Sequence, residues 1–469
     1  MLFYSPFALF LFLPLVFVLY WAAGRRHRNL VLLAASAFFY AWGEPRFFLV
    51  AIASALADYV IGARIHAHAG SSRARAWLAL GVVLNVGLLA YYKYFNFFVD
   101  NLNLALTQWG MAPVANLDIL LPIGVSFIVF EKITYLVDLY RRRGHPAGSV
   151  ASYMLYVFFF PKLLAGPIIK YHDIEYQIER RSVHGEDFAA GLTRFVLGMA
   201  KKLFIADTCG EVADAVFGLP PGQASTQQAW LGALAFTFQI YFDFSAYSDM
   251  AIGLARMMGF RLLENFHYPY TAASFTDFWH RWHISLSSWI REYLYIPLGG
   301  NRHGPLRTYF NLWASFLLSG LWHGASWNFV LWGAWNGLFL TLDKLFLLRL
   351  TRAGPRILPV AATFFLVVLG WVVFRSASLE QTVAMLHAMF VPTDERHYLY
   401  VKANQWFFLG LAALLCVVPW SGAYRHLVER YKAWRWRLAV ENVALGAAAW
   451  LAIGKVFVAG FNPFLYFRF

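Results

Sequence analysis

The sequence predicts an all-α protein embedded in a lipid bilayer. Of its 469 residues, 60% are hydrophobic and only 14% are charged, whereas about a quarter of the residues in a soluble globular chain are charged. Apolar runs long enough to approach or cross a hydrocarbon core recur from one end of the chain to the other. No extensive polar segment separates these runs, so we expect one membrane domain over residues 1–469.

Twelve apolar segments are predicted to form spanning helices. They lie at about 6–23, 29–43, 47–63, 76–96, 118–139, 188–206, 229–257, 309–322, 325–346, 357–374, 405–420 and 441–460. The first could be mistaken for a signal peptide. No basic region precedes it and no small-residue cleavage site follows it, so we expect a helix of the mature protein.

Two further segments are predicted to be re-entrant or interfacial. Residues 151–169 carry Pro161, Gly166 and Pro167, and broken backbone is tolerated at membrane depth where protein or a cavity surrounds it. Residues 271–298 mix charged with aromatic side chains, as interfacial helices do.

The basic residues indicate an orientation for the chain. With the N-terminus placed outside, the inner loops carry 27 Lys and Arg residues and the outer side carries 5. Basic loops face the cytosol, so we expect both termini outside and segment 256–307 inside. The net charge of +14 does not indicate nucleic acid, because the basic residues cluster in short loops between apolar runs.

One histidine lies in an unusually apolar stretch. His323 belongs to SGLWHGASWNFVLWGAWNG, where an ionisable side chain at bilayer depth costs at least about 2.5 kcal/mol. Imidazole suits proton transfer near neutral pH, so we expect His323 to be a general base. The alternative is a hydrogen bond to a neighbouring helix. Gly320 and Gly324 predict that two helices approach closely here.

The densest polar segment runs from residue 274 to 304. On a helix, Asp277 and Arg281 could pair at i,i+4, and His280 and His283 would share one face at i,i+3. The alternative is an amphipathic surface helix with solvated charges. A metal site built from His280, His283 and His323 is conceivable, but an HxxH pair alone is weak evidence, so we expect no metal.

Polar groups also occur inside other predicted spans. One span contains Asp243, Ser245, Ser248 and Asp249. We expect a structural polar network there, with Arg256 as one partner. Glu131 and Lys132 lie in another span and are expected to form a structural ion pair.

Other classes of site lack their sequence signatures. No GxSxG elbow, Walker loop, GxGxxG fingerprint or HExxH pair is present. Cys209 and Cys416 form no metal-ligand pattern, and a disulfide between them stays open.

Several long strings occur in a fixed order along the chain. They are LPIGVSFIVFEKITYLVDLYRRR, FPKLLAGPIIKYHDI, YFDFSAYSDMAIGLARMMGF, NFHYPYTAASFTDFWHRWHISLSSWIREYLYIPLGGNR, SGLWHGASWNFVLWGAWNG, WVVFRSASLEQ and FNPFLYFRF. Together they resemble the membrane-bound O-acyltransferase family, in particular its bacterial branch that acts in alginate O-acetylation. The resemblance runs essentially from end to end.

The resemblance implies a fold and two catalytic residues. The fold is a ring of about 11–12 transmembrane helices, with re-entrant or interfacial helices, around a central funnel or tunnel. The family's WHG histidine corresponds to His323, and the WHISLS histidine corresponds to His283. One departure is His280, because the family usually has arginine at this position. The histidine would alter the charge at the cytosolic mouth of the funnel or tunnel.

The resemblance also implies an activity. The implied protein is an O-acetyltransferase of the bacterial cytoplasmic membrane. It passes acetyl groups from acetyl-CoA across the membrane to an extracytoplasmic acceptor, for the O-acetylation of an alginate-like exopolysaccharide. We expect the phosphates of acetyl-CoA to contact some of four arginines, Arg281, Arg291, Arg302 and Arg307. The immediate acceptor is expected to be an exported, esterase-like acetyltransferase. Alternatives are D-alanyl or lipid acyl transfer, a polysaccharide or acetyl transporter, and a scaffold of an export complex.

Overall fold

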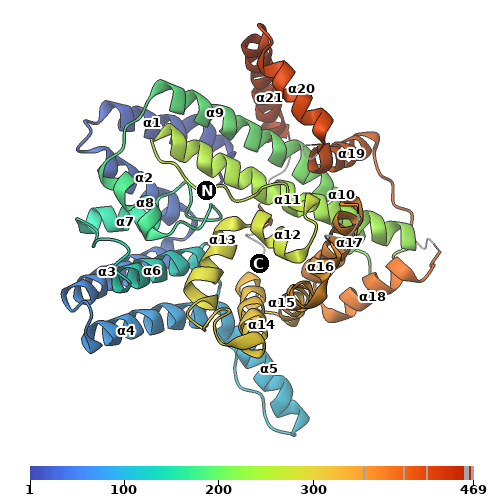
Figure 1. Ribbon diagram of the computed structural model, residues 1–469, viewed down its shortest axis with the longest axis horizontal. Helices are drawn as coiled ribbons and strands as arrows, with labels where there is room; N and C mark the ends of the chain where they lie inside the picture. Colours follow the sequence, from blue (N-terminus) through green and yellow to red (C-terminus); the bar gives the residue numbers. More distant parts are fainter. Residues whose placement is uncertain (352–354, 395–396, 419–420, 459–463, 466–469) are drawn as a thin grey trace. The chain divides into compact units, whose positions relative to one another are not determined.

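The computed structural model describes residues 1–351, 355–394, 397–418, 421–458 and 464–465 (Figure 1). Every regular element in these ranges is a helix, which confirms the all-α prediction. Within them, four helical segments are long and apolar enough to cross a membrane: Pro45–Ala67, Ser72–Gln108, Ile357–Arg375 and Arg437–Val458. A bent pair, Ala403–Val417 with Gly422–Lys432, raises that number to five if the pair is one span.

The chain divides into two compact units. Unit 1 comprises Met1–Leu192 and Ala251–Leu263, and unit 2 comprises Thr193–Met250 and Glu264–Phe469. Helices α9 (Gly185–Ala200) and α11 (Thr226–Met257) therefore contribute to both. The single membrane domain over residues 1–469 stays a prediction.

The other elements follow in chain order. Unit 1 holds η1 (Ala8–Phe12), α1 (Leu13–Ala22), α2 (Arg28–Gly43), α3 (Pro45–Ala67), α4 (Ser72–Leu89), η2 (Ala90–Tyr94), α5 (Phe95–Gln108), α6 (Val125–Tyr140), α7 (Val150–Phe158) and α8 (Tyr171–Glu179). Unit 2 holds η3 (Lys201–Ala206), α10 (Asp207–Phe217), η4 (Pro269–Thr271), α12 (Phe275–Arg281), α13 (Ile284–Ile290), η5 (Arg291–Tyr295), α14 (Gly304–His323), α15 (Trp327–Leu342), η6 (Asp343–Leu347), α16 (Leu348–Leu350), α17 (Ile357–Arg375), α18 (Leu379–Phe390), α19 (Ala403–Val417), α20 (Gly422–Lys432) and α21 (Arg437–Val458).

A helix occupies each predicted span, and the largest differences in helix boundaries are at two places. Residues 97–117 lie between two predicted spans and were expected to form an outer loop, but the chain is helical through Gln108. No glycine or proline interrupts it before Gly110, and the positive φ of Gly110 (72°) ends the helix. The span predicted from residue 118 becomes helical only at Val125. Pro122 and the left-handed Gly124 (φ 78°) keep the preceding residues out of the helix.

In unit 1, α3, α4 and α6 pack side by side (Figure 1). Glycines make the close contact possible. A Cβ on Gly81 would lie 2.4 Å from Leu136, and one on Gly62 would lie 2.5 Å from the Tyr135 ring. A larger residue at either glycine would require the α6 side chains to move, so both glycines favour the close packing of the three helices.

Two charged side chains of α6, Glu131 and Lys132, form ion pairs with other elements and not with each other. Lys132 pairs with Asp58 on α3 at 3.1 Å, and Glu131 pairs with Lys162 in the turn after α7. The expected pair between Glu131 and Lys132 is therefore wrong. Consecutive helical residues point about 100° apart, so the two side chains reach different neighbours.

The polar residues of α11 also have other partners than expected. Asp243 pairs with Lys202, and Asp249 pairs with Arg194 at 2.9 Å. Arg256 pairs with Asp187 at 3.2 Å rather than with the predicted acids. Seven residues of helix separate Asp249 from Arg256 by about 10 Å, which is beyond side-chain contact.

The predicted re-entrant segments are both broken in the structure. After α7 ends at Phe158, residues 159–170 form turns and irregular backbone, and every residue of that stretch is buried. Residues 271–298 are divided among η4, α12, α13 and η5. Irregular backbone enclosed by protein is the arrangement that a membrane protein tolerates.

Helices α14 and α15 of unit 2 form a closely packed antiparallel pair. A Cβ on Gly320 would lie 2.1 Å from the Phe329 carbonyl oxygen, and one on Gly333 would lie 2.4 Å from the Phe316 carbonyl oxygen. A Cβ on Gly324 would meet the Phe329 ring at 2.0 Å. The close helix approach predicted at Gly320 and Gly324 is confirmed, and it places the end of α14 directly against α15.

Most of the terminal string FNPFLYFRF lies outside the described residues. The two that the structure describes are anchored in unit 2. Leu465 N donates to Asp243 Oδ2 at 2.7 Å, and the Phe464 ring packs on Tyr247 with centroids 4.7 Å apart.

Candidate active site

His323 is the last residue of α14 and lies among aromatic rings. Its ring centroid is 4.9 Å from that of Trp322, 4.9 Å from that of Trp332 on α15, and 5.4 Å from that of Phe374 on α17. The backbone becomes extended at Gly324 (φ −171°, ψ 151°) and ends the helix there. His323 is 4% exposed, so three helices of unit 2 hold a nearly enclosed imidazole.

His283 occupies the break between α12 and α13. Its backbone is left-handed (φ 44°, ψ 54°), which is uncommon for a residue other than glycine, and the side chain is fully buried. The ring packs edge to face on Phe244 of α11, with centroids 4.5 Å apart. Residues held in such backbone conformations cluster at functional sites, because the surrounding structure must support the strain.

The expected sharing of one helix face by His280 and His283 is wrong. Helix α12 ends at Arg281 and Trp282 is extended, so the two histidines point in different directions: His280 is exposed and His283 is buried. In the described ranges, no group of three or more His, Cys, Asp or Glu residues is placed to hold a metal.

Asn265 fixes the position of His283. Its Oδ1 accepts from Ser285 N at 3.2 Å and from Ser285 Oγ at 2.9 Å, and it lies 3.2 Å from His283 Nδ1. A backbone N–H can only donate, so this atom of Asn265 is the oxygen, and His283 Nδ1 must donate its proton to it. The neutral ring held in this way carries its lone pair on Nε2.

Trp322 connects the two histidines. Its ring centroid lies 6.1 Å from that of His283 and 4.9 Å from that of His323. The structure therefore brings the two residues that the resemblance implies to be catalytic into one aromatic cluster, although 40 positions separate them in the sequence. Both rings are buried here, so the open funnel or tunnel stays a prediction.

The four arginines expected at the donor site differ in their surroundings. Arg281 Nε donates to Asp277 Oδ1 at 2.7 Å, as the i,i+4 spacing predicted, and the side chain is half-buried. Arg307 reaches the Leu298 carbonyl at 3.4 Å and lies over the Phe310 ring. Arg291 and Arg302 are exposed.

Sequence reasoning missed three polar residues of this site. Asn265 was not singled out, because nothing in its local pattern points to His283. Ser315 and Ser319 precede His323 by two turns and one turn of α14, and both hydroxyls are buried without a hydrogen-bond partner among the described residues. Their spacing of four was visible in the sequence and could have shown a polar stripe that ends at His323.

The disulfide that the sequence left open is not formed. Cys209 and Cys416 are both buried as free thiols. Both belong to the hydrophobic core of unit 2.

Comparison with known proteins identifies the family. Residues 147–383, which include both histidines, match the MBOAT, membrane-bound O-acyltransferase family. The chain belongs to this family. It is therefore a multi-pass membrane O-acyltransferase that uses an acyl donor.

Similarity to individual relatives extends beyond the family match. The probable alginate O-acetylase AlgI of Pseudomonas aeruginosa is 48% identical over 394 residues, which cover 83% of this chain and 75% of the relative. The protein of the same name from Pseudomonas putida is 42% identical and aligns over 100% of both chains. A peptidoglycan O-acetyltransferase of Helicobacter pylori is 36% identical over 83% of this chain and 80% of its own length.

Proposed function

We propose that this membrane O-acyltransferase transfers acetyl groups from cytosolic acetyl-CoA to an exported acceptor that O-acetylates an alginate-like exopolysaccharide. The names of the relatives with 42–48% identity support acetyl transfer and alginate. The observation that carries the proposal is the meeting of His283 and His323 at Trp322. Of two buried imidazoles at one centre, one can transfer the proton of an acyl transfer and the other can orient the acceptor hydroxyl.

His323 performs the proton transfer in this proposal. An acceptor hydroxyl attacks the thioester carbonyl, a C–O bond forms, and the C–S bond breaks. His323 takes the hydroxyl proton and returns it to the departing thiolate, so the imidazole is unchanged after one turnover. In the second route, His323 first receives the acetyl group with release of the thiol and then passes it to the hydroxyl.

His283 positions the reacting groups. Asn265 Oδ1 accepts a hydrogen bond from the Nδ1–H group, so the neutral ring offers Nε2 as an acceptor. An acceptor atom can orient a hydroxyl, whereas stabilising an oxyanion requires a donor and therefore a protonated ring. The hydrogen bond to Asn265 thus favours a role for His283 in orienting the acyl acceptor.

The donor enters from the cytosol. In this proposal, segment 256–307 faces the cytosol and both termini lie outside the bacterial cytoplasmic membrane, an orientation that the distribution of basic residues supports. Exposed Arg291 and Arg302 are available to the phosphates of acetyl-CoA, while Arg281 and Arg307 already contact protein groups. The acceptor on the outer side is a serine of an exported, esterase-like acetyltransferase.

Replacement of His323 tests the proposal. His323→Ala should abolish acetylation of the exported polysaccharide in cells that lack the native protein, because the proton-transfer group is removed. Acetyl content is measured by NMR of the isolated polysaccharide. The matched control is His280→Ala, which replaces an exposed histidine on α12 and should keep acetylation. Normal acetylation by His323→Ala protein at wild-type abundance would exclude the proposed role.

The purified protein distinguishes the donors. With labelled acetyl-CoA, wild-type protein should release free CoA in the presence of the acceptor, and the His323→Ala variant should not. Turnover with a D-alanyl carrier protein instead of acetyl-CoA would assign the chain to D-alanyl transfer. Label that stays on wild-type protein and is absent from the variant identifies the covalent route.

A further inference from the structure

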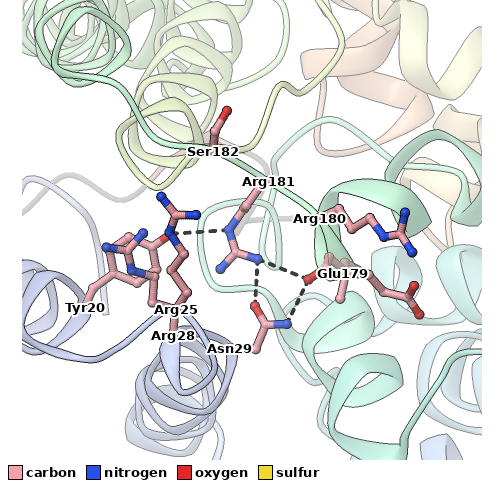
Figure 2. A pocket seen from close by; sticks show the side chains of 9 residues that line it. Tyr20, Arg25, Arg28, Asn29, Glu179, Arg180, Arg181 and Ser182 are labelled. Carbon is pink, nitrogen blue, oxygen red and sulfur yellow. Dashed lines mark hydrogen bonds between the residues drawn. The ribbon is translucent and has the colours of Figure 1, made fainter.

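Unit 1 contains a cavity rich in arginine that the proposed acyl transfer does not use. It has a volume of about 370 Å³ and lies between the end of α1, the start of α2 and the end of α8 (Figure 2). Four of its lining residues are Arg25, Arg28, Arg180 and Arg181. None of them is among the arginines expected to bind the donor.

Arg181 is built into the cavity wall. Its Nη1 donates to Asn29 Oδ1 at 2.7 Å and to the Ile178 carbonyl at 3.2 Å (Figure 2). Its Nε donates to the Met258 carbonyl at 3.1 Å and to the Tyr20 hydroxyl at 3.3 Å. The guanidinium also lies over the Phe260 ring, 4.2 Å from its centroid. All of these contacts are neutral, so they orient Arg181 without compensating its charge.

Arg28 is held in a similar way. Its guanidinium lies over the rings of Tyr20 and Trp21, 5.1 Å and 5.3 Å from their centroids. Its Nε is buried and has no hydrogen-bond partner among the described residues. The protein thus leaves part of the hydrogen-bonding capacity of Arg28 unused.

The cavity has an excess of positive charge. In the described part of the chain, no ion pair joins any of the four arginines to a carboxylate. The one acid in the lining is Glu179, and Figure 2 shows its carboxylate directed away from Arg181. Burial lowers the pKa of Arg181, and the charge of Arg28 lowers it further. A bound anion would relieve both effects.

We propose that this cavity binds a phosphate-bearing anion. Arginine forks match the geometry of phosphate oxygens. Arg25, Arg28 and Arg181 are the candidates to bind the anion, because Figure 2 shows the guanidinium group of Arg180 directed away from Arg181.

The surroundings favour the headgroup of an anionic phospholipid over a soluble phosphate. The adjoining end of α1 exposes Val18, Leu19 and Trp21, and a tryptophan beside basic residues at a helix end is typical of the membrane interface. The four arginines belong to loops 24–28 and 170–187, which the distribution of basic residues predicts to face the cytosolic leaflet. That leaflet carries anionic lipid.

The test titrates full-length protein in neutral detergent with phosphatidylglycerol, phosphatidylcholine or inorganic phosphate. Native mass spectrometry counts the bound ligand. Wild-type protein should bind phosphatidylglycerol more tightly than phosphatidylcholine, and Arg25→Gln/Arg28→Gln should weaken that binding about tenfold or more, because each basic group near the surface contributes to anionic lipid attraction. The matched control is Arg73→Gln/Arg75→Gln, which removes two exposed arginines from the start of α4, within the predicted inner loop 64–75. This control should leave the affinity within about twofold, because neither residue lines the cavity.

The outcomes separate the two sources of phosphate. Arginine-dependent binding of phosphatidylglycerol alone identifies the lipid headgroup. Binding of inorganic phosphate that is lost in the same variant identifies a soluble ligand and keeps the site. Equal binding by wild type, cavity variant and control for every ligand overturns the proposal. If the double variant does not fold, Arg25→Gln alone, at an exposed position, gives the same comparison with a smaller effect.

Discussion

Two buried polar regions of the molecule differ in how their side chains are held. In unit 1, Lys162 and Glu131 form an ion pair, whereas in unit 2 His283 and His323 lie among aromatic rings. The exposed fractions are alike, between 0% and 4% for all four residues. Burial therefore does not distinguish a structural polar group from a catalytic candidate, but the neighbouring side chains do.

The difference follows from what each region must tolerate. An ion pair stays stable only while both charges persist, because removing one leaves the other uncompensated in a medium of low polarity. A catalytic imidazole changes its charge during each proton transfer. Aromatic rings hold such a group by packing, which does not depend on the charge that it carries at a given moment.

The largest expected effect is on stability in unit 1. Lys162→Met leaves the Glu131 carboxylate buried without its partner and should lower the free energy of unfolding by about 3–5 kcal/mol. Thermal and denaturant unfolding of the purified protein in detergent measures the change. The double variant Lys162→Met/Glu131→Gln removes both charges and should recover most of the loss. Wild-type stability of the single variant would show that the pair is not structural.

A smaller effect is expected on the rate of acyl transfer. Asn265→Ala removes the oxygen that accepts the hydrogen bond from His283 Nδ1–H. The variant should lower kcat about 10–100-fold with little change in KM, because this hydrogen bond sets the tautomer and the orientation of the ring. Steady-state kinetics of acetyl transfer measures both constants. Asn265→Asp keeps an oxygen acceptor and should restore most of the rate. Equal kcat in wild type and Asn265→Ala would place His283 outside the reaction.

The smallest effect is expected at Ser319, and its sign is opposite to that of Lys162→Met. Ser319→Ala removes a buried hydroxyl that has no hydrogen-bond partner among the described residues, so the free energy of unfolding should stay unchanged or rise by up to about 1 kcal/mol. If the hydroxyl serves the reaction at His323, kcat falls in the same variant. Unfolding and kinetic measurements on the same variant test the role of Ser319. If the hydroxyl were structural, the variant would have a lower free energy of unfolding than wild type.

Local patterns in the sequence predicted the features that depend on neighbours along one helix. The pair between Asp277 and Arg281 follows from i,i+4 spacing, and the close approach at Gly320 follows from small residues four positions apart. His323 was recognisable because an ionisable residue in an apolar stretch is costly. The helical segments themselves followed from the lengths of the apolar runs.

Features that depend on contacts across the fold could not be predicted in this way. The left-handed backbone of His283 interrupts the helix, so extrapolating helical periodicity wrongly placed His280 beside it. The contact between Asn265 and His283 joins a loop to a helix break, and no periodic signal marks it. The predicted partners of Arg256 were wrong for a related reason, because its observed partner, Asp187, belongs to another helix.

The contact between α14 and α15 also limits how a substrate can reach His323. With backbone pressed on backbone at Gly320 and Gly333, the helices cannot slide past each other without a steric clash, so they move as one body. Trp332 is carried on that body and accompanies His323 in any motion. If His323 acts as proposed, an acetyl group must reach it by displacement of neighbours outside this helix pair, at Phe374 on α17 or at the break that contains His283.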